Sequence, residues 1–181
     1  DAGFLPDDVS LVLMSHLHFD HSGGMVQKSD GRIVLSFPNA EYVIQRGEWE
    51  AAYSKPSASY HTDIFDLVQR SGSIRFVEGN GQLNKNIRFE VSGGHTEFHQ
   101  VFMIEESGET LFFGGDVVPE PEQLIRKFMA KYDFNPRKTM ELREAYGKQA
   151  AEGNWTCLYY HAKSKPFSKV ALTDSGFQIL S

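Results

Sequence analysis

Three histidines and one aspartate lie close together near the start of the chain, in the segment SHLHFDHSGG (15–24). They are His16, His18, Asp20 and His21. Imidazole nitrogens and carboxylate oxygens are side-chain ligands of divalent metals such as zinc, iron and manganese. The spacing therefore predicts that one loop contributes several ligands to a metal site, with further ligands coming from elsewhere in the chain.

Three further candidate ligands each follow a predicted strand: His95 after 87–92, Asp116 after 110–113 and His161 after 155–160. The ends of strands are where a sheet scaffold holds catalytic loops. Together the candidates amount to five imidazoles and two carboxylates. One zinc-like ion takes about four ligands, and a catalytic ion leaves one position open. The count therefore favours two ions that share a bridging carboxylate.

The rest of the sequence predicts a mixed α/β fold, with short strands and helices around one core. Strands are expected at 9–15, 40–45, 74–78, 87–92, 101–105, 110–113 and 155–160, helices at 47–53, 62–70 and 136–149, and a final hairpin turning at 173–176. Asn135 followed by Pro136 is a good helix start. We expect the whole chain, 1–181, to be a single domain.

Composition excludes several classes of partner. The net charge of −6, without a basic block, argues against binding to nucleic acid or to a membrane surface. No apolar run approaches the roughly 18 residues that span a bilayer. The single cysteine, Cys157, cannot form an intrachain disulfide, and we expect it to be buried and inert. This is compatible with a cytoplasmic location, which we expect for the chain.

The motifs HLHFDH, GGHTEFH, GGD and YYH, in that order, resemble those of the metallo-β-lactamase superfamily of hydrolases. The resemblance covers nearly the whole chain, and it implies an αββα sandwich with the metals at one edge of the two sheets. It also implies the ligand sets: His16, His18 and His95 on one metal, Asp20, His21 and His161 on the second, and Asp116 bridging both.

Within the superfamily, SHLHFDHSGG followed by YVIQRGEWEAA is most similar to the N-acyl homoserine lactonase branch. Lactonases of that type have a substrate-positioning tyrosine soon after the bridging aspartate, and the segment DVVPEPEQ has none. Glu97 and Phe98 also replace the usual Pro-Gly of the third motif.

Family members carry several strands before the histidine loop, whereas this chain, which begins at Asp1 without a methionine, offers about eight residues. We therefore expect an N-terminally incomplete copy of the fold, with the first sheet incomplete. The uncovered sheet edge and apolar surface would allow a homodimer.

The implied activity is hydrolysis of a small carboxylic ester or lactone, such as an acyl homoserine lactone, by a metal-bound hydroxide. Two divalent ions, zinc or else iron or manganese, would lower the pKa of a shared water from 15.7 toward about 7. Asp116 would bridge the ions, and Asp20 would carry a proton to the leaving group. His99 would orient a ligand by a hydrogen bond.

Other functions stay open at the level of sequence. They are thioester hydrolysis of the glyoxalase II type, phosphoester hydrolysis, and a non-catalytic use of the fold. Diiron redox chemistry on this fold is disfavoured, because His18 stands where those proteins carry a glutamate. Several large apolar side chains are more consistent with core than with a substrate pocket: Phe19, Tyr53, Tyr60, Phe128, Met129, Tyr132 and Phe134.

Overall fold

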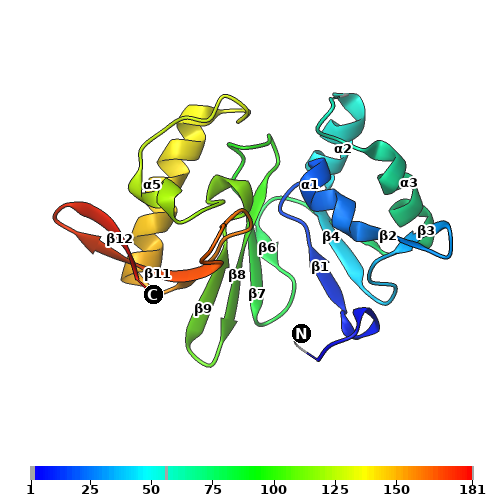
Figure 1. Ribbon diagram of the computed structural model, residues 1–181, viewed down its shortest axis with the longest axis horizontal. Coiled ribbons are helices and arrows are strands. Elements are labelled where there is room, and N and C mark those ends of the chain that lie inside the picture. The colour runs from blue at the N-terminus through cyan, green and yellow to red at the C-terminus, as the bar shows by residue number, and fades with distance from the viewer. Residues whose placement is uncertain (1–2, 56, 181) are drawn as a thin grey trace. The chain divides into compact units, whose positions relative to one another are not determined.

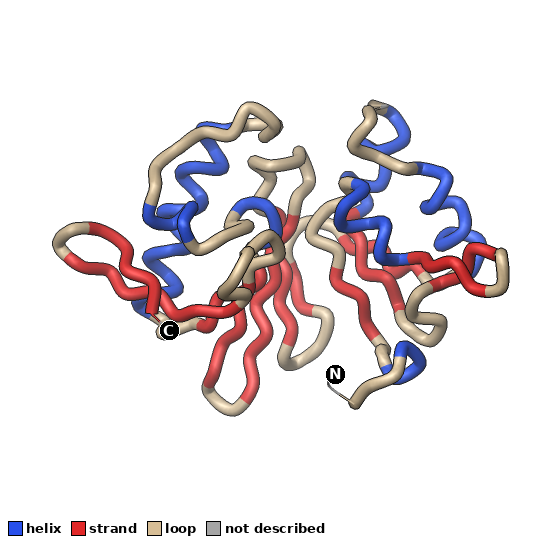
Figure 2. Tube along the Cα trace, viewed as in Figure 1, coloured by secondary structure: helices blue, strands red, loops and turns tan. Residues whose placement is uncertain are grey.

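The computed structural model describes residues 3–55 and 57–180 and has the mixed α/β class that the sequence predicts. The chain divides into two compact units, 1–78 and 79–181, which are described one at a time. The single domain expected from the sequence stays a prediction. Figure 1 labels the elements, and Figure 2 separates helices, strands and loops by colour.

The first unit holds a small parallel sheet with strand order β1-β4-β5. Its elements are a short 3-10 turn (Pro6–Asp8), β1 (Leu11–Leu13), α1 (Phe19–Ser22), a second 3-10 turn (Gly23–Met25), β2 (Val26–Ser29), β3 (Arg32–Leu35), β4 (Glu41–Gln45), α2 (Arg46–Ser54), α3 (Thr62–Ser71) and β5 (Ile74–Val77). The central strand β4 has an apolar middle, YVI (42–44), as expected of a parallel strand that is covered on both faces.

The core of the first unit forms between this sheet and the two longer helices. Tyr42 and Ile44 of β4 are buried, together with Trp49 of α2 and with Phe65 and Val68 of α3. The Tyr42 hydroxyl satisfies its hydrogen bonding by donating to the Met25 carbonyl at 3.2 Å. Burial of these aromatic and aliphatic side chains is the main stabilising term for so small a sheet.

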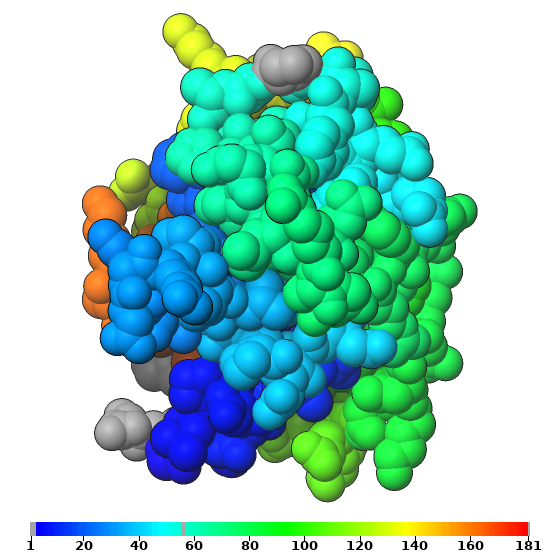
Figure 3. Space-filling model, turned by 90° about the vertical axis from the view of Figure 1, so that its right-hand side faces the viewer, coloured from blue at the N-terminus to red at the C-terminus, as the bar shows by residue number. Residues whose placement is uncertain are grey.

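The hairpin β2–β3 is an element that the sequence interpretation missed. Asp30 and Gly31 form its turn with φ angles of 49° and 77°, as a type I′ turn requires. In the space-filling view of Figure 3 the hairpin lies beside α3 on the exposed face of the first unit.

The second unit holds a seven-stranded sheet with strand order β12-β11-β10-β9-β8-β7-β6. Its elements are β6 (Gly81–Gln82), β7 (Ile87–Val91), β8 (Gln100–Glu106), β9 (Glu109–Phe113), a 3-10 turn (Gly115–Val117), α4 (Glu122–Ile125), α5 (Pro136–Glu152), β10 (Thr156–Leu158), β11 (Phe167–Thr173) and β12 (Gly176–Leu180). All neighbouring pairs are antiparallel except β9 and β10, which are parallel.

Helix α5 covers one face of this sheet and buries its apolar side against it. Tyr146 packs on Phe112 with ring centroids 4.9 Å apart, and Ala150 is buried beside them. The helix begins as the sequence predicts, because the Asn135 side chain accepts a hydrogen bond from the Lys138 backbone N–H at 3.1 Å and Pro136 occupies the first turn.

Two strands are shorter than expected. The strand predicted at 9–15 is β1, three residues long, and the strand predicted at 155–160 is β10, also three residues long. In both cases the chain leaves the sheet early and continues into a loop that carries candidate ligands. No helix among the described residues is long and apolar enough to cross a membrane.

Candidate metal centre

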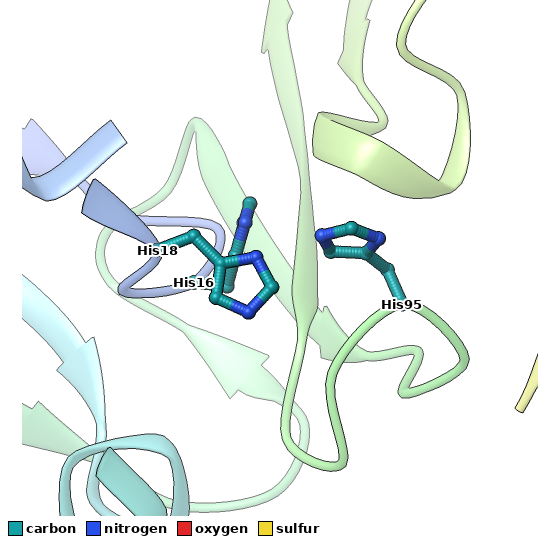
Figure 4. A group of neighbouring side chains, drawn as sticks. All are labelled: His16, His18 and His95. Carbon is teal, nitrogen blue, oxygen red and sulfur yellow. The ribbon is translucent and has the colours of Figure 1, made fainter. Parts of the chain in front are cut away.

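The loop after β1 brings the first group of histidines together. His16 is buried, and its ring lies 4.6 Å from that of His18 and 4.1 Å from that of His21 between centroids. The His16 Nδ1 lies 3.1 Å from the Ser15 hydroxyl, so Nε2 is the nitrogen oriented for a metal. Figure 4 shows His16 and His18 on this loop, and His95 on the loop of the second unit that follows β7.

A single helical turn, α1, orients the rest of this group. The sequence interpretation treated 15–24 as a loop throughout, which is wrong at Phe19–Ser22. The backbone N–H groups of His21 and Ser22 both donate to the His18 carbonyl, at 3.0 and 2.8 Å. This turn places the Asp20 Oδ2 3.7 Å from the His21 Nε2, while the Asp20 side chain stays accessible to solvent.

The buried carboxylate of Glu48 holds the backbone of this loop by a hydrogen bond, and the sequence interpretation did not identify it. Glu48 of α2 is 1% exposed, and its Oε1 accepts hydrogen bonds from the Leu17 backbone N–H and from the Tyr60 hydroxyl, each at 3.1 Å. Leu17 lies between two candidate ligands, so this contact fixes the backbone that carries them. In the sequence Glu48 cannot be distinguished from a solvent-exposed glutamate on a helix surface. Its burial is evident only from the fold.

In the second unit the Asp116 carboxylate lies between two histidines. One oxygen, Oδ2, lies 3.4 Å from the His95 Nε2, and the other, Oδ1, lies 3.3 Å from the His161 Nε2. Asp116 itself is 8% exposed and belongs to the 3-10 turn after β9. Each carboxylate oxygen therefore faces a different imidazole, as a bridging ligand would.

His99 supports Asp116 from the interior. The Asp116 backbone N–H donates to the His99 Nε2 at 3.1 Å, which makes that nitrogen an acceptor. The other ring nitrogen, Nδ1, then carries the proton and donates to the Ser92 hydroxyl at 2.7 Å. His99 is fully buried and acts on the backbone of a candidate ligand, in agreement with its expected orienting role.

The loop that carries His95 is tightly fitted against the start of α5. Gly94 adopts φ +87°, and a Cβ at this position would lie 2.8 Å from the Thr139 hydroxyl oxygen. The Gly94 and His95 carbonyls accept hydrogen bonds from the Asn135 and Phe134 backbone N–H groups, at 2.8 and 2.9 Å. The His95 Nδ1 lies 2.8 Å from Asp133, a residue that the sequence interpretation missed.

The distances around Asp116 fit a metal site. Two ligand atoms that hold one tetrahedral ion at about 2.0–2.1 Å lie about 3.4 Å from each other. The observed separations of 3.4 and 3.3 Å match this, and they exceed the 2.8 Å between His95 and Asp133. The donor set of imidazoles and carboxylates also suits zinc, iron or manganese.

The environment of the single cysteine does not favour a role as a nucleophile. Cys157 is 2% exposed, and burial raises its thiol pKa to about 11, so the thiolate is scarce at neutral pH. The expected inert role of Cys157 is in agreement with this environment.

Several large apolar side chains expected in the core are exposed instead. Most lie on the segment 125–134, where Met129, Tyr132 and Phe134 are 59%, 65% and 62% exposed. The Tyr132 ring lies edge-on to His95 with centroids 5.9 Å apart. Partial burial and the Asp133 carboxylate raise the pKa of Tyr132 above its ordinary value.

All seven predicted ligands thus occur in two groups, one in each unit. His16, His18, Asp20 and His21 gather in the first unit. His95, Asp116 and His161 gather in the second. Glu48 and Asp133 are the buried carboxylates that sequence reasoning did not find.

Comparison with known proteins gives a family and a set of relatives. Residues 1–161 match the family model described as the metallo-beta-lactamase superfamily. The N-acyl homoserine lactonase AttM of Rhizobium johnstonii is 44% identical over 91% of this chain and 65% of its own length. Across three of the lactonases that match, this chain spans between 36% and 65% of the relative's length.

Solved structures share the fold. A probable metal-dependent hydrolase from Staphylococcus aureus has a TM-score of 0.82 and 23% identity, over 98% of this chain and 64% of that one. AidC, described as a dizinc quorum-quenching lactonase, has a TM-score of 0.79 and 22% identity, over 99% of this chain and 66% of that one.

Proposed function

Because the chain belongs to the metallo-beta-lactamase superfamily, we propose that it is a dinuclear metal-dependent hydrolase of a small carboxylic ester or lactone. The observation that carries the proposal is the Asp116 carboxylate, whose two oxygens lie 3.4 and 3.3 Å from the Nε2 atoms of His95 and His161. A carboxylate that faces two imidazoles with separate oxygens has the arrangement of a ligand shared by two ions.

The proposed ligand sets are those that the resemblance to the family implies. One ion would be held by His16, His18 and His95, the second by Asp20, His21 and His161, and Asp116 would contact both. The orientation of two imidazoles supports this assignment. His16 and His95 each direct Nδ1 to a polar side chain of their own unit, to Ser15 and to Asp133, so that Nε2 is the ligating nitrogen.

The bound ions would supply Lewis acidity and a hydroxide nucleophile at neutral pH. The chain's own residues would transfer protons during the reaction and hold the ligands in position. Asp20 is accessible to solvent and lies beside His21, so its carboxylate can pass a proton to the leaving group. His99 holds the backbone of Asp116, and Glu48 holds the backbone between His16 and His18.

We propose an N-acyl homoserine lactone as the substrate. The relative AttM, named as an N-acyl homoserine lactonase, is 44% identical over 91% of this chain. The exposed apolar side chains of the segment 125–134 also suit an acyl chain, since Phe134 donates its backbone N–H to the His95 carbonyl and so lies next to a proposed ligand. The Tyr132 hydroxyl offers a hydrogen-bond donor on the same segment, in place of the tyrosine missing after Asp116.

A substrate panel tests this function. The zinc-loaded protein is assayed with homoserine lactones of short and long acyl chain, a model thioester, a phosphodiester and a phosphotriester, and acid release is followed with a pH indicator. We expect the lactones to be hydrolysed fastest, with the activity lost on chelation and in the Asp116→Ala variant.

Three results would contradict the proposal. Faster turnover of the thioester than of the lactones would indicate a glyoxalase II-like activity. Faster turnover of a phosphoester than of the lactones would indicate a phosphoester hydrolase. Absence of turnover on all substrates by a protein that carries its metals would favour a non-catalytic role.

A further inference from the structure

Asp133 is a buried carboxylate with two charged or polar neighbours. Its side chain is fully buried, and its Oδ1 lies 2.8 Å from the His95 Nδ1. Its other oxygen, Oδ2, lies 3.9 Å from the Arg143 guanidinium, which is also buried. A buried carboxylate is costly unless it is paired and hydrogen-bonded, and the His95 contact and the charge of Arg143 each offset part of that cost for Asp133.

The contact with Asp133 determines which nitrogen of the His95 ring carries the proton. A carboxylate only accepts hydrogen bonds, so the proton must lie on the His95 Nδ1. The opposite nitrogen, Nε2, then points to the Asp116 Oδ2 at 3.4 Å. The single contact thus decides both the tautomer and the direction of the nitrogen that would bind a metal.

Arg143 connects this pair to the Asp116 loop. Its Nε donates to the carbonyl of Val117, the residue that follows Asp116, at 2.7 Å. Its Nη1 donates to the Phe128 carbonyl at 3.2 Å. The guanidinium also lies over the Phe128 ring, 4.9 Å from the centroid. One side chain of α5 therefore contacts both the residue that follows Asp116 and the carboxylate that holds His95.

We infer that Asp133 and Arg143 are positioning residues of the metal centre, with Asp133 acting through the His95 imidazole and Arg143 acting through Asp133 and the backbone after Asp116. The inference rests on the proposed function. Carboxylates that accept the second N–H of a ligating histidine raise its basicity and set its orientation, and their loss lowers metal affinity about 10–100-fold.

Two variants of Asp133 separate the effect of its negative charge from the effect of its hydrogen bond to His95. Asp133→Asn keeps the size and one acceptor oxygen but removes the charge, and Asp133→Ala removes the hydrogen bond as well. The matched control is Asp66→Asn, because the Asp66 carboxylate accepts a side-chain hydrogen bond from the Tyr53 hydroxyl at the same 2.8 Å and pairs with Arg70, and neither partner is a proposed ligand.

The experiment measures zinc affinity by competition with a chromophoric chelator. We expect both Asp133 variants to bind zinc more weakly than the unaltered protein, within the roughly 10–100-fold range and most strongly for Asp133→Ala, while Asp66→Asn is unchanged. Circular dichroism and thermal unfolding of the metal-free proteins check folding. If Asp133→Ala fails to fold, the isosteric Asp133→Asn decides the result.

A second readout does not need a metal. Nitrogen-15 NMR of the metal-free protein reports which His95 nitrogen carries the proton, and we expect Nδ1–H in the unaltered protein and a mixture of tautomers in Asp133→Ala. Unchanged zinc affinity or an unchanged tautomer in folded Asp133→Ala would overturn the inference. If the unaltered protein binds no zinc, the proposed function fails, and the tautomer measurement still tests the link between Asp133 and His95.

Discussion

At the scale of single residues, the candidate ligands are oriented by contacts that the sequence could not reveal. His16, His18, Asp20 and His21 can be found from their spacing alone, because few loops carry so many metal-binding groups. Asp133 and Glu48 could not be found in this way. Their importance comes from burial beside the ligand loops, which depends on tertiary contacts between segments far apart in the chain.

Asp20 should act in proton transfer as well as in metal binding. We expect Asp20→Asn to lower kcat on a lactone about 10²–10⁴-fold, the range typical of a general acid or base. The amide keeps an oxygen that can ligate, so metal content should fall less than activity. The measurement is kcat as a function of pH together with metal content per chain.

The control for this variant is Asp174→Asn, in the turn between β11 and β12 of the final hairpin. Full activity in Asp20→Asn with its metals bound would show that Asp20 carries no proton in the reaction.

At the scale of elements, the register of two strands explains why Asp116 and His161 meet. β9 and β10 are parallel, and Phe113 is paired with Leu158. Asp116 and His161 each follow their paired residue by three positions, and parallel strands end at the same edge of a sheet. The sequence predicted that both strands end in candidate ligands, but it could not predict their parallel pairing, which depends on the crossover through α5.

The missed hairpin β2–β3 was readable from the sequence. Asp-Gly at 30–31 is a strong signal for a two-residue turn, and the segment RIVL (32–35) that follows it is rich in β-branched and apolar residues. By contrast, the one-turn helix α1 inside the histidine loop carries no such signal, because its geometry comes from hydrogen bonds to the His18 carbonyl.

The loop before His95 should be destabilised when a single methyl group is added at Gly94. We expect Gly94→Ala to lower the free energy of unfolding by about 1–3 kcal/mol, because φ is +87° there and the added Cβ would meet the Thr139 hydroxyl oxygen at 2.8 Å. Displacement of His95 should also weaken metal binding. Urea unfolding and zinc titration measure the two effects.

Gly24→Ala is the matched control, since Gly24 is also in a ligand loop, is not at positive φ, and has nothing within 4 Å of an added Cβ. Equal stability of the Gly94 and Gly24 variants would show that the tight fit between His95 and α5 does not constrain the loop.

At the scale of the whole molecule, the mixed α/β class and the family are as the sequence predicted. The motifs suffice for this because they are spread over nearly the whole chain. The homodimer and the cytoplasmic location stay predictions, since they depend on partners and surroundings that a single chain does not contain.

Buried acidic groups should make the fold sensitive to alkaline pH. Burial raises the pKa of Cys157 to about 11, and it also raises the pKa values of Tyr146 and Tyr159. Each group is protonated more readily when folded than when unfolded. Its stabilising contribution is therefore complete below the unfolded pKa, near 8.5 for cysteine and 10 for tyrosine, and is lost as the pH rises through the folded value.

We expect the free energy of unfolding to be level near pH 7–8 and to fall steadily from about pH 9 to 11, with Cys157 alone contributing roughly 2 kcal/mol of the loss. Urea unfolding at each pH measures it. The Cys157→Ala variant should show a shallower decline. A stability that rises with pH over this range would contradict the buried environment of these groups.

The most direct test of the account is the metal content of the protein, because the shared carboxylate at Asp116 is its central claim. The protein is purified without chelators or a histidine tag, and metals are counted per chain by plasma mass spectrometry. We predict about two equivalents for the unaltered protein, falling to about one or fewer for Asp116→Ala. No bound metal and no uptake of zinc or manganese, or two equivalents that survive in Asp116→Ala, would contradict the bridged site.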